Sequence, residues 1–159
     1  MKRYLGGLPF RIDIRPLGGH ITGPSVVLLH GNHVLNTVYV HAARPDDFLE
    51  KIGQGVNARA GDVVCFGHTH VPWHRTVDGI HYVNAGSVGR PKDADWRAAY
   101  VVLDLTAGGV HVDVLRVAYD VERSARAIVE SGLPSDLADY LRTGGRPLAA
   151  QSPGGAASG

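Results

Sequence analysis

The stretch Asp62-Val63-Val64-Cys65-Phe66-Gly67-His68-Thr69-His70 decides the fold class of this chain and points to its chemistry. Val63 to Phe66 is a short run of β-branched and aromatic residues that ends at a glycine, which predicts a buried strand. Two imidazoles follow this strand two residues apart. Because residues i and i+2 of an extended segment point to the same side, we expect His68 and His70 to converge at the strand end. Imidazole is the commonest metal ligand, so this turn is the candidate functional centre.

A second strand ends in a similar way. Val26-Val27-Leu28-Leu29 is apolar throughout, which predicts a strand buried on both faces, and His30-Gly31 follows it directly. The chain therefore contains two predicted buried strands, and a histidine follows each of them.

The remaining segments predict a mixed α/β chain. Phe10, Ile12 and Ile14 alternate with charged residues, as in a half-buried strand. Apolar runs on both sides of Asp78-Gly79 and of residues 107–109 predict two β-hairpins. Helical spacing predicts three helices: from Pro45 to Gly53 or Gly55, from Asp120 to Gly132, and from a capping Ser135 through Leu141.

The composition predicts one globular domain over residues 1–143. Residues 144–159 are rich in Gly, Ala, Ser and Pro, which predicts a disordered tail. With 44% hydrophobic and 19% charged residues, a net charge of +1 and no Lys/Arg cluster, neither a nucleic-acid patch nor a membrane surface is expected as a partner. No run approaches the roughly 20 apolar residues of a transmembrane helix. The one cysteine, Cys65, lies in an apolar run, which predicts an inert buried thiol and fits a cytoplasmic location.

Three motifs together resemble those of the calcineurin-like metallophosphoesterases, in particular the small bacterial phosphodiesterase branch. They are Val27-Leu28-Leu29-His30-Gly31, Phe66-Gly67-His68-Thr69-His70-Val71-Pro72 and Val83-Asn84-Ala85-Gly86-Ser87-Val88-Gly89. The resemblance covers roughly residues 4–143 and corresponds to the C-terminal half of the family domain. It implies an α/β (α+β) fold, the C-terminal portion of a four-layer αββα sandwich that is rich in strands and ends in helices.

The same resemblance implies a two-metal site. His30 and His68 would bind one divalent metal and His70 the other, and the metals would activate a water that hydrolyses a phosphodiester or phosphomonoester. Neutral imidazole suits Mn, Zn, Fe or Ni better than Mg or Ca, and manganese is the metal we expect. The substrate would be a small phosphate ester or a nucleotide.

The chain departs from the family pattern upstream of His30. The family's Asp-x-His and Gly-Asp motifs are missing there, since Asp13 is the only aspartate and Arg15 stands where the histidine would. Two alternatives follow: a truncated enzyme that needs a missing N-terminal half or forms a homo-oligomer, or an inactive fragment or degenerate scaffold without catalysis.

Two further assignments compete at single motifs. Gly31-Asn32-His33 matches another family motif, in which Asn32 and His41 would be ligands and His33 would face the phosphate, although Val34 replaces the acid. The segment 85–89 is similar to a serine-hydrolase nucleophile elbow with Ser87 as nucleophile, but that elbow needs a helix directly after the serine, which Gly89-Arg90-Pro91 disfavours. His74 and His81, on opposite arms of a predicted hairpin, are expected at the surface.

Overall fold

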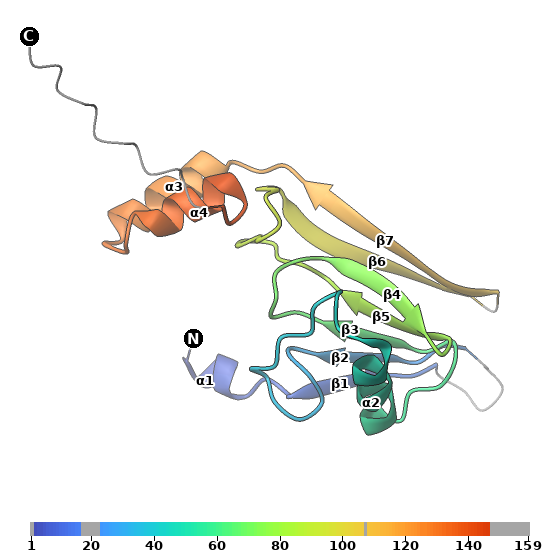
Figure 1. Ribbon diagram of the computed structural model, residues 1–159. Coiled ribbons are helices and arrows are strands. Elements are labelled where there is room, and N and C mark those ends of the chain that lie inside the picture. The colour runs from blue at the N-terminus through green and yellow to red at the C-terminus, as the bar shows by residue number, and fades with distance from the viewer. Residues whose placement is uncertain (1, 17–22, 107, 147–159) are drawn as a thin grey trace, which may run out of the picture.

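A five-stranded sheet forms the centre of the chain (Figure 1). The computed structural model describes residues 2–16, 23–106 and 108–146. The sheet order is β1-β2-β3-β5-β4, with β2, β3 and β5 parallel and the two edge strands antiparallel to their neighbours. The strands are β1 (Arg11–Ile14), β2 (Val26–Leu29), β3 (Val63–Phe66), β4 (Trp73–Val77) and β5 (Ile80–Asn84).

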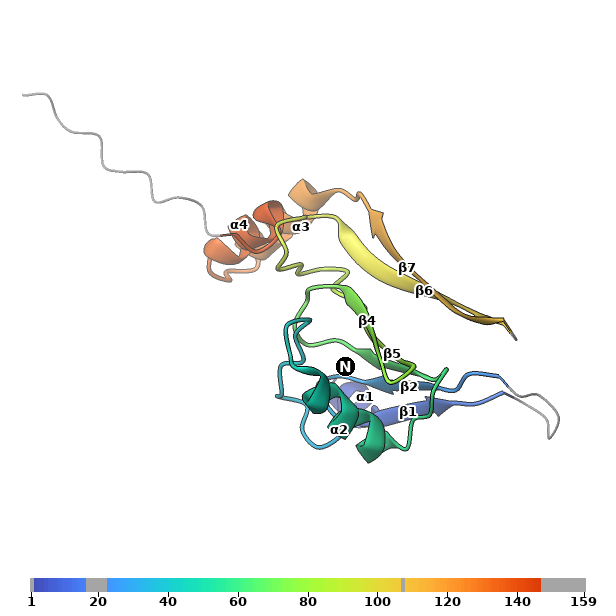
Figure 2. The same cartoon turned by 45° about the vertical axis from the view of Figure 1, so that its right-hand side comes forward.

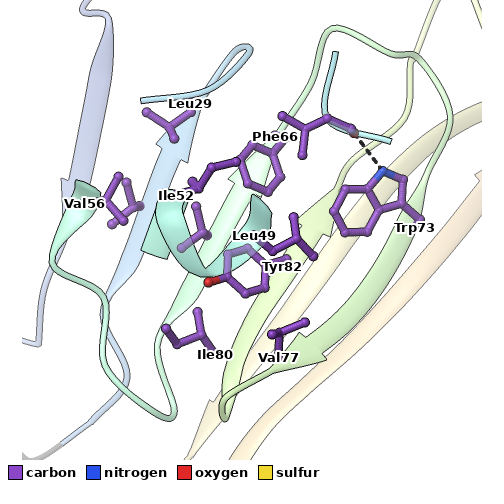
Figure 3. Packing of buried hydrophobic residues seen from close by; sticks show 12 residues of the cluster. Leu29, Leu49, Ile52, Val56, Phe66, Trp73, Val77, Ile80 and Tyr82 are labelled. Atoms are coloured by element: carbon purple, nitrogen blue, oxygen red, sulfur yellow. Dashed lines mark hydrogen bonds between the residues drawn. The ribbon is translucent and has the colours of Figure 1, made fainter. Parts of the chain in front are cut away.

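One face of the sheet packs against helix α2 (Asp46–Val56). The helix buries Leu49, Ile52 and Val56, which recur at helical spacing, among apolar side chains of the strands (Figure 3). The indole Nε1 of Trp73 donates to the carbonyl of Val40 at 3.2 Å, so the connection before α2 is tied to β4. This layer is the larger of the two hydrophobic clusters and comprises Val27, Leu29, Val40, Leu49, Ile52, Val56, Val64, Phe66, Trp73, Val77, Ile80 and Tyr82.

The opposite face packs against a two-stranded sheet made of β6 (Ala98–Thr106) and β7 (Gly109–Val117) (Figure 2). Val26, Val63 and Val83 meet the inward side chains of this hairpin, which are Val101, Leu103, Val110 and Val112. Helices α3 (Val121–Glu130) and α4 (Asp136–Thr143) pack on each other beside one end of the hairpin in both views, and the short α1 (Lys2–Gly6) precedes β1. The predicted α/β class and the strand-rich order with C-terminal helices are confirmed.

The local predictions hold for the buried strands and the turns. β2 and β3 are almost entirely buried, as their apolar runs predicted. Asp78 (φ 49°) and Gly79 (φ 75°) both have positive φ, the conformation that a type I′ hairpin turn requires. No helix within the described ranges is long and apolar enough to span a bilayer.

The predicted end of α2, at Gly53 or Gly55, was wrong. α2 runs through Gly53 and Gly55 and ends at Val56, and its C-cap Asn57 takes the left-handed conformation (φ 58°). Both glycines are needed for close packing: a Cβ at Gly53 would lie 2.4 Å from the Tyr82 hydroxyl, and one at Gly55 would lie 2.3 Å from the His33 ring. The two glycines therefore mark close contacts of the helix and not its end.

The predicted burial of the first strand was also wrong. Phe10, Ile12 and Ile14 are 44%, 45% and 51% exposed. β1 is an edge strand, and the β6–β7 hairpin covers β2, β3 and β5 without reaching it. The apolar face of β1 consequently lies open.

At the C-terminal end, α4 follows Ser135 as predicted, but the Ser135 side chain makes no capping hydrogen bond. Its backbone is already helical, with φ −65° and ψ −27°, so the hydroxyl is not placed to accept from the first turn. Gly144 (φ 65°) closes α4, and residues 147–159 of the predicted tail lie outside the described residues.

Candidate metal centre

The candidate centre lies where β2 and β3 end. These strands are parallel neighbours, with Leu28 paired to Cys65, so their carboxyl ends meet at the same edge of the sheet. The N–H of Gly67 donates to the carbonyl of His30 at 3.0 Å and joins the two ends beyond the ladder. The sheet topology thus brings His30 next to a histidine 38 positions later in the chain.

His30 and His68 are in direct contact. His30 Nε2 and His68 Nδ1 lie 3.2 Å apart, and the rings meet edge to face with centroids 5.0 Å apart. A metal–imidazole bond is about 2.0–2.1 Å long, so one ion could reach both nitrogens at this separation. The other nitrogen of His68, Nε2, is buried without a hydrogen-bond partner. The pair therefore fits a divalent metal.

The extended geometry predicted for His68 and His70 was wrong. β3 ends at Phe66, and both histidines have left-handed backbone conformations, with φ of 62° and 61°. Such values are uncommon for residues other than glycine and cost conformational energy, which the surrounding structure must offset. The two side chains are thus directed by a strained turn and not by the alternation of a strand.

His70 is oriented by a backbone carbonyl. Its Nδ1 lies 2.7 Å from the carbonyl oxygen of Arg90. A carbonyl only accepts, so Nδ1 carries the proton and the lone pair of the neutral ring is on Nε2. This arrangement is common for histidines that bind metals, because the carbonyl bonded to one ring nitrogen selects the tautomer.

The electrostatics of the site favour the neutral form of His30. Burial lowers the pKa of His30, and the positive charges that His68 and His70 would carry lower it further. His68 and His70 thus both lie close enough to affect His30. Neutral imidazole is the form that binds a metal.

A buried asparagine holds the histidine turn in place. Asn84, at the end of β5, is fully buried, and its Nδ2 donates to the Gly67 carbonyl at 2.7 Å and to Thr69 Oγ1 at 3.0 Å. Its Oδ1 accepts from the N–H of Gly86 at 2.9 Å, so all of this side chain's polar groups are used. The motif around Asn84 therefore anchors the turn that carries the two histidines.

Within the described ranges, no group of three His, Cys, Asp or Glu side chains is close enough to hold one ion. His30 and His68 are brought together, and His70 is directed separately by Arg90. The assignment of His30 and His68 to one metal and of His70 to another stays a prediction.

The alternative ligands are engaged elsewhere. Asn32 Oδ1 accepts from the N–H groups of Val34 and Leu35, at 2.9 and 2.7 Å, and so closes a local turn. The His33 ring packs against Gly55 of α2. The His41 ring stacks on Tyr39, with centroids 5.7 Å apart.

Ser87 lacks the setting of a nucleophile elbow. No helix follows it within the described part of the chain before β6, and its Oγ accepts from the N–H of Arg90 at 2.9 Å. Cys65 fits the inert thiol expected, since burial raises its pKa to about 11. His74 and His81 do more than share the surface: His74 Nε2 and His81 Nδ1 lie 3.0 Å apart, across the hairpin.

Tyr39 is a residue of the site that sequence reasoning missed. Its ring lies 4.3 Å from that of His68, centroid to centroid, and so packs directly against a candidate ligand. The segment around it has no regular structure and no hydrophobic period, so only the folded chain reveals the contact.

The family model of the calcineurin-like phosphoesterase superfamily domain matches residues 17–108. Among curated proteins, the uncharacterized protein MJ0912 of Methanocaldococcus jannaschii is 26% identical over 89% of this chain and 59% of its own length. Among solved structures, a metallophosphoesterase from Sphaerobacter thermophilus aligns with a TM-score of 0.68 and 23% identity over 89% of this chain and 60% of its own. The hypothetical protein PH1004 from Pyrococcus horikoshii aligns with a TM-score of 0.73 and 19% identity, over 92% and 55% respectively.

The chain thus spans between 55% and 60% of the length of these relatives. The two structural likenesses establish the fold, and the family match extends over more than half of the 159 residues, including His30, His68 and His70. The chain belongs to the calcineurin-like phosphoesterase superfamily.

Proposed function

We propose that this chain provides the imidazole ligands of a metal-dependent phosphoesterase. The observation that carries the proposal is the contact between His30 Nε2 and His68 Nδ1 at 3.2 Å, at the carboxyl ends of neighbouring parallel strands. Ligands in open parallel sheets characteristically bind at this end of the strands. In the proposal, His30 and His68 bind one divalent metal and His70 binds the second.

Neighbouring groups orient the histidines of the site. Arg90 keeps the proton of His70 on Nδ1, which leaves Nε2 free for a metal. Burial and the neighbouring imidazoles hold His30 neutral, and Tyr39 packs on one side of His68. When bound, two divalent metals would supply Lewis-acid charge for the phosphoryl oxygens and an activated water for hydrolysis of a phosphodiester or phosphomonoester.

The donor set favours a borderline metal. Imidazole nitrogens suit Mn, Zn, Fe or Ni, and of these we propose manganese. A small phosphate ester or nucleotide is the proposed substrate, because a net charge of +1 without a basic cluster offers no surface for a nucleic-acid polymer. The single, half-buried cysteine is consistent with a cytoplasmic location.

Metal binding is the first test. The purified chain and its His30→Ala, His68→Ala and His70→Ala variants are loaded with Mn²⁺ or Zn²⁺, and bound metal is measured by mass spectrometry and calorimetry. We expect each substitution to reduce the metal content. His111→Ala is the matched control, because His111 is an exposed histidine of β7 that pairs with Asp113. Unchanged metal content in the His30 and His68 variants would refute the ligand assignment.

A second measurement separates an enzyme from a scaffold. Hydrolysis of a generic aryl phosphodiester is followed with and without added metal. Metal-dependent turnover that His68→Ala abolishes supports catalysis by this chain. Metal binding without turnover instead supports a non-catalytic relative, or an enzyme that needs the 40% or more of its relatives' length that this chain does not span.

A further inference from the structure

We propose that the open edge of β1 pairs with the same strand of a second copy of the chain, so that two five-stranded sheets join into one. β1 is the outer strand of the sheet, and its apolar side chains Phe10, Ile12 and Ile14 are all more than 40% exposed. An exposed, apolar edge strand is a template for pairing with another strand.

The backbone groups that face outward follow from the ladder. The carbonyl of Ser25 accepts from the N–H of Val63, so the odd-numbered residues of β2 turn their backbone groups toward β3 and the even-numbered ones toward β1. Leu28 pairs with Ile12 and Val26 with Ile14, so Ile12 and Ile14 bond to β2. The N–H and C=O groups of Arg11 and Asp13 therefore point away from the sheet.

The sequence of β1 is complementary to itself. In an antiparallel pair centred on Ile12, Arg11 lies opposite Asp13 of the second copy, and Phe10 lies opposite Ile14. Each Arg11–Asp13 pair can exchange both main-chain hydrogen bonds, while the two Ile12 side chains meet in the close, non-hydrogen-bonded position. The register is selective, because a shift by two residues would place Asp13 opposite Asp13 or Arg11 opposite Arg11.

Arg11 and Asp13, the charged side chains of β1, already bond to each other within one chain. Arg11 and Asp13 are joined within one chain at 2.5 and 2.8 Å, and Arg11 also donates to the carbonyl of Val56 at the end of α2. Two copies would bring two guanidinium groups and two carboxylates together in alternation.

The test begins with sedimentation of the full chain over a concentration series. We expect a reversible monomer–dimer equilibrium. Asp13→Arg and Arg11→Asp should each weaken dimerisation at least about tenfold, because each places like charges opposite one another. A mixture of the two variants restores opposite charges across the pair, so heterodimers should form where neither variant dimerises alone. Circular dichroism checks that both variants fold.

Disulfide trapping tests the register without altering any charge. Ile12→Cys places two thiols directly opposite each other and should cross-link on mild oxidation. Ile14→Cys is the matched control, since its cysteine would face Phe10 and should not cross-link. The native Cys65 is half-buried and its pKa is raised to about 11, so it should not compete. A chain that stays monomeric at its highest soluble concentration, or equal cross-linking of both variants, overturns the proposal.

Discussion

Replacing Gly53 with alanine measures how tightly α2 packs on the sheet that carries the candidate centre. In a free helix this change would stabilise by about 1 kcal/mol, because glycine is the poorer helix former. Here the new Cβ would lie 2.4 Å from the Tyr82 hydroxyl and 3.0 Å from Ile80 Cδ1. Tyr82 is fully buried and has no room to swing away, and such overpacking costs about 1–3 kcal/mol. We expect Gly53→Ala to lower the free energy of unfolding by about 1 kcal/mol.

The same substitution should cost much less once the hydroxyl is removed. In Tyr82→Phe the nearest ring atom, Cζ, lies 3.6 Å from the new Cβ, an ordinary contact, and only Ile80 Cδ1 at 3.0 Å still has to shift, so the loss caused by Gly53→Ala should fall to about zero. Tyr82→Phe alone should change stability by about 1 kcal/mol or less. Urea unfolding followed by circular dichroism measures the stability of the wild-type chain, both single variants and the double variant, with an expected coupling of about 1 kcal/mol.

Gly55→Ala serves as the comparison for this cycle. Its Cβ would meet the His33 ring, which is only half-buried and can rotate aside, so the loss should be smaller. If Gly53→Ala stabilises the wild-type chain, or acts equally in both backgrounds, then α2 does not pack against Tyr82 as described.

Three further outcomes are expected. Asn84→Ala should destabilise the fold by at least about 2 kcal/mol in urea unfolding, because the Gly67 carbonyl and the Thr69 hydroxyl lose their donor. The same variant should bind Mn²⁺ more weakly in calorimetry. An unchanged metal affinity would contradict the positioning role of Asn84. Cys65 should resist alkylation at pH 8 until denaturant is added, since burial raises its pKa to about 11, and rapid modification of the folded chain would refute that burial. Burial and the neighbouring His81 lower the pKa of His74 in the folded chain. Near pH 6 the unfolded chain therefore binds more protons than the folded one. The free energy of unfolding should fall as the pH drops from about 6.5 toward the lowered pKa of His74. His74→Gln should make that fall shallower, and an identical pH profile would refute the contribution of the pair.

Local patterns predicted the elements of this chain well. The apolar runs before His30 and His68 identified β2 and β3, Asp78-Gly79 identified the hairpin turn, and Pro45-Asp46-Asp47 identified the start of α2. These patterns depend on backbone preference and hydrophobic spacing over a few residues, so a short stretch of sequence is enough to predict the element. The end of α2 was misjudged because Gly53 and Gly55 respond to contacts with residues distant in sequence.

The sequence alone identified the candidate residues of the site: His30 and the Gly67-His68-Thr69-His70 turn follow buried strands, and the family match covers them. Only the tertiary structure decided how they are arranged. Parallel pairing of β2 with β3 brings His30 to His68, left-handed backbone at His68 and His70 replaces the extended geometry, and Asn84, Arg90 and Tyr39 orient the turn. The exposure of β1 was likewise decided by which strands the β6–β7 hairpin covers. Strand order and side-chain packing bring together residues that are far apart along the chain, and no local sequence pattern specifies which of them meet.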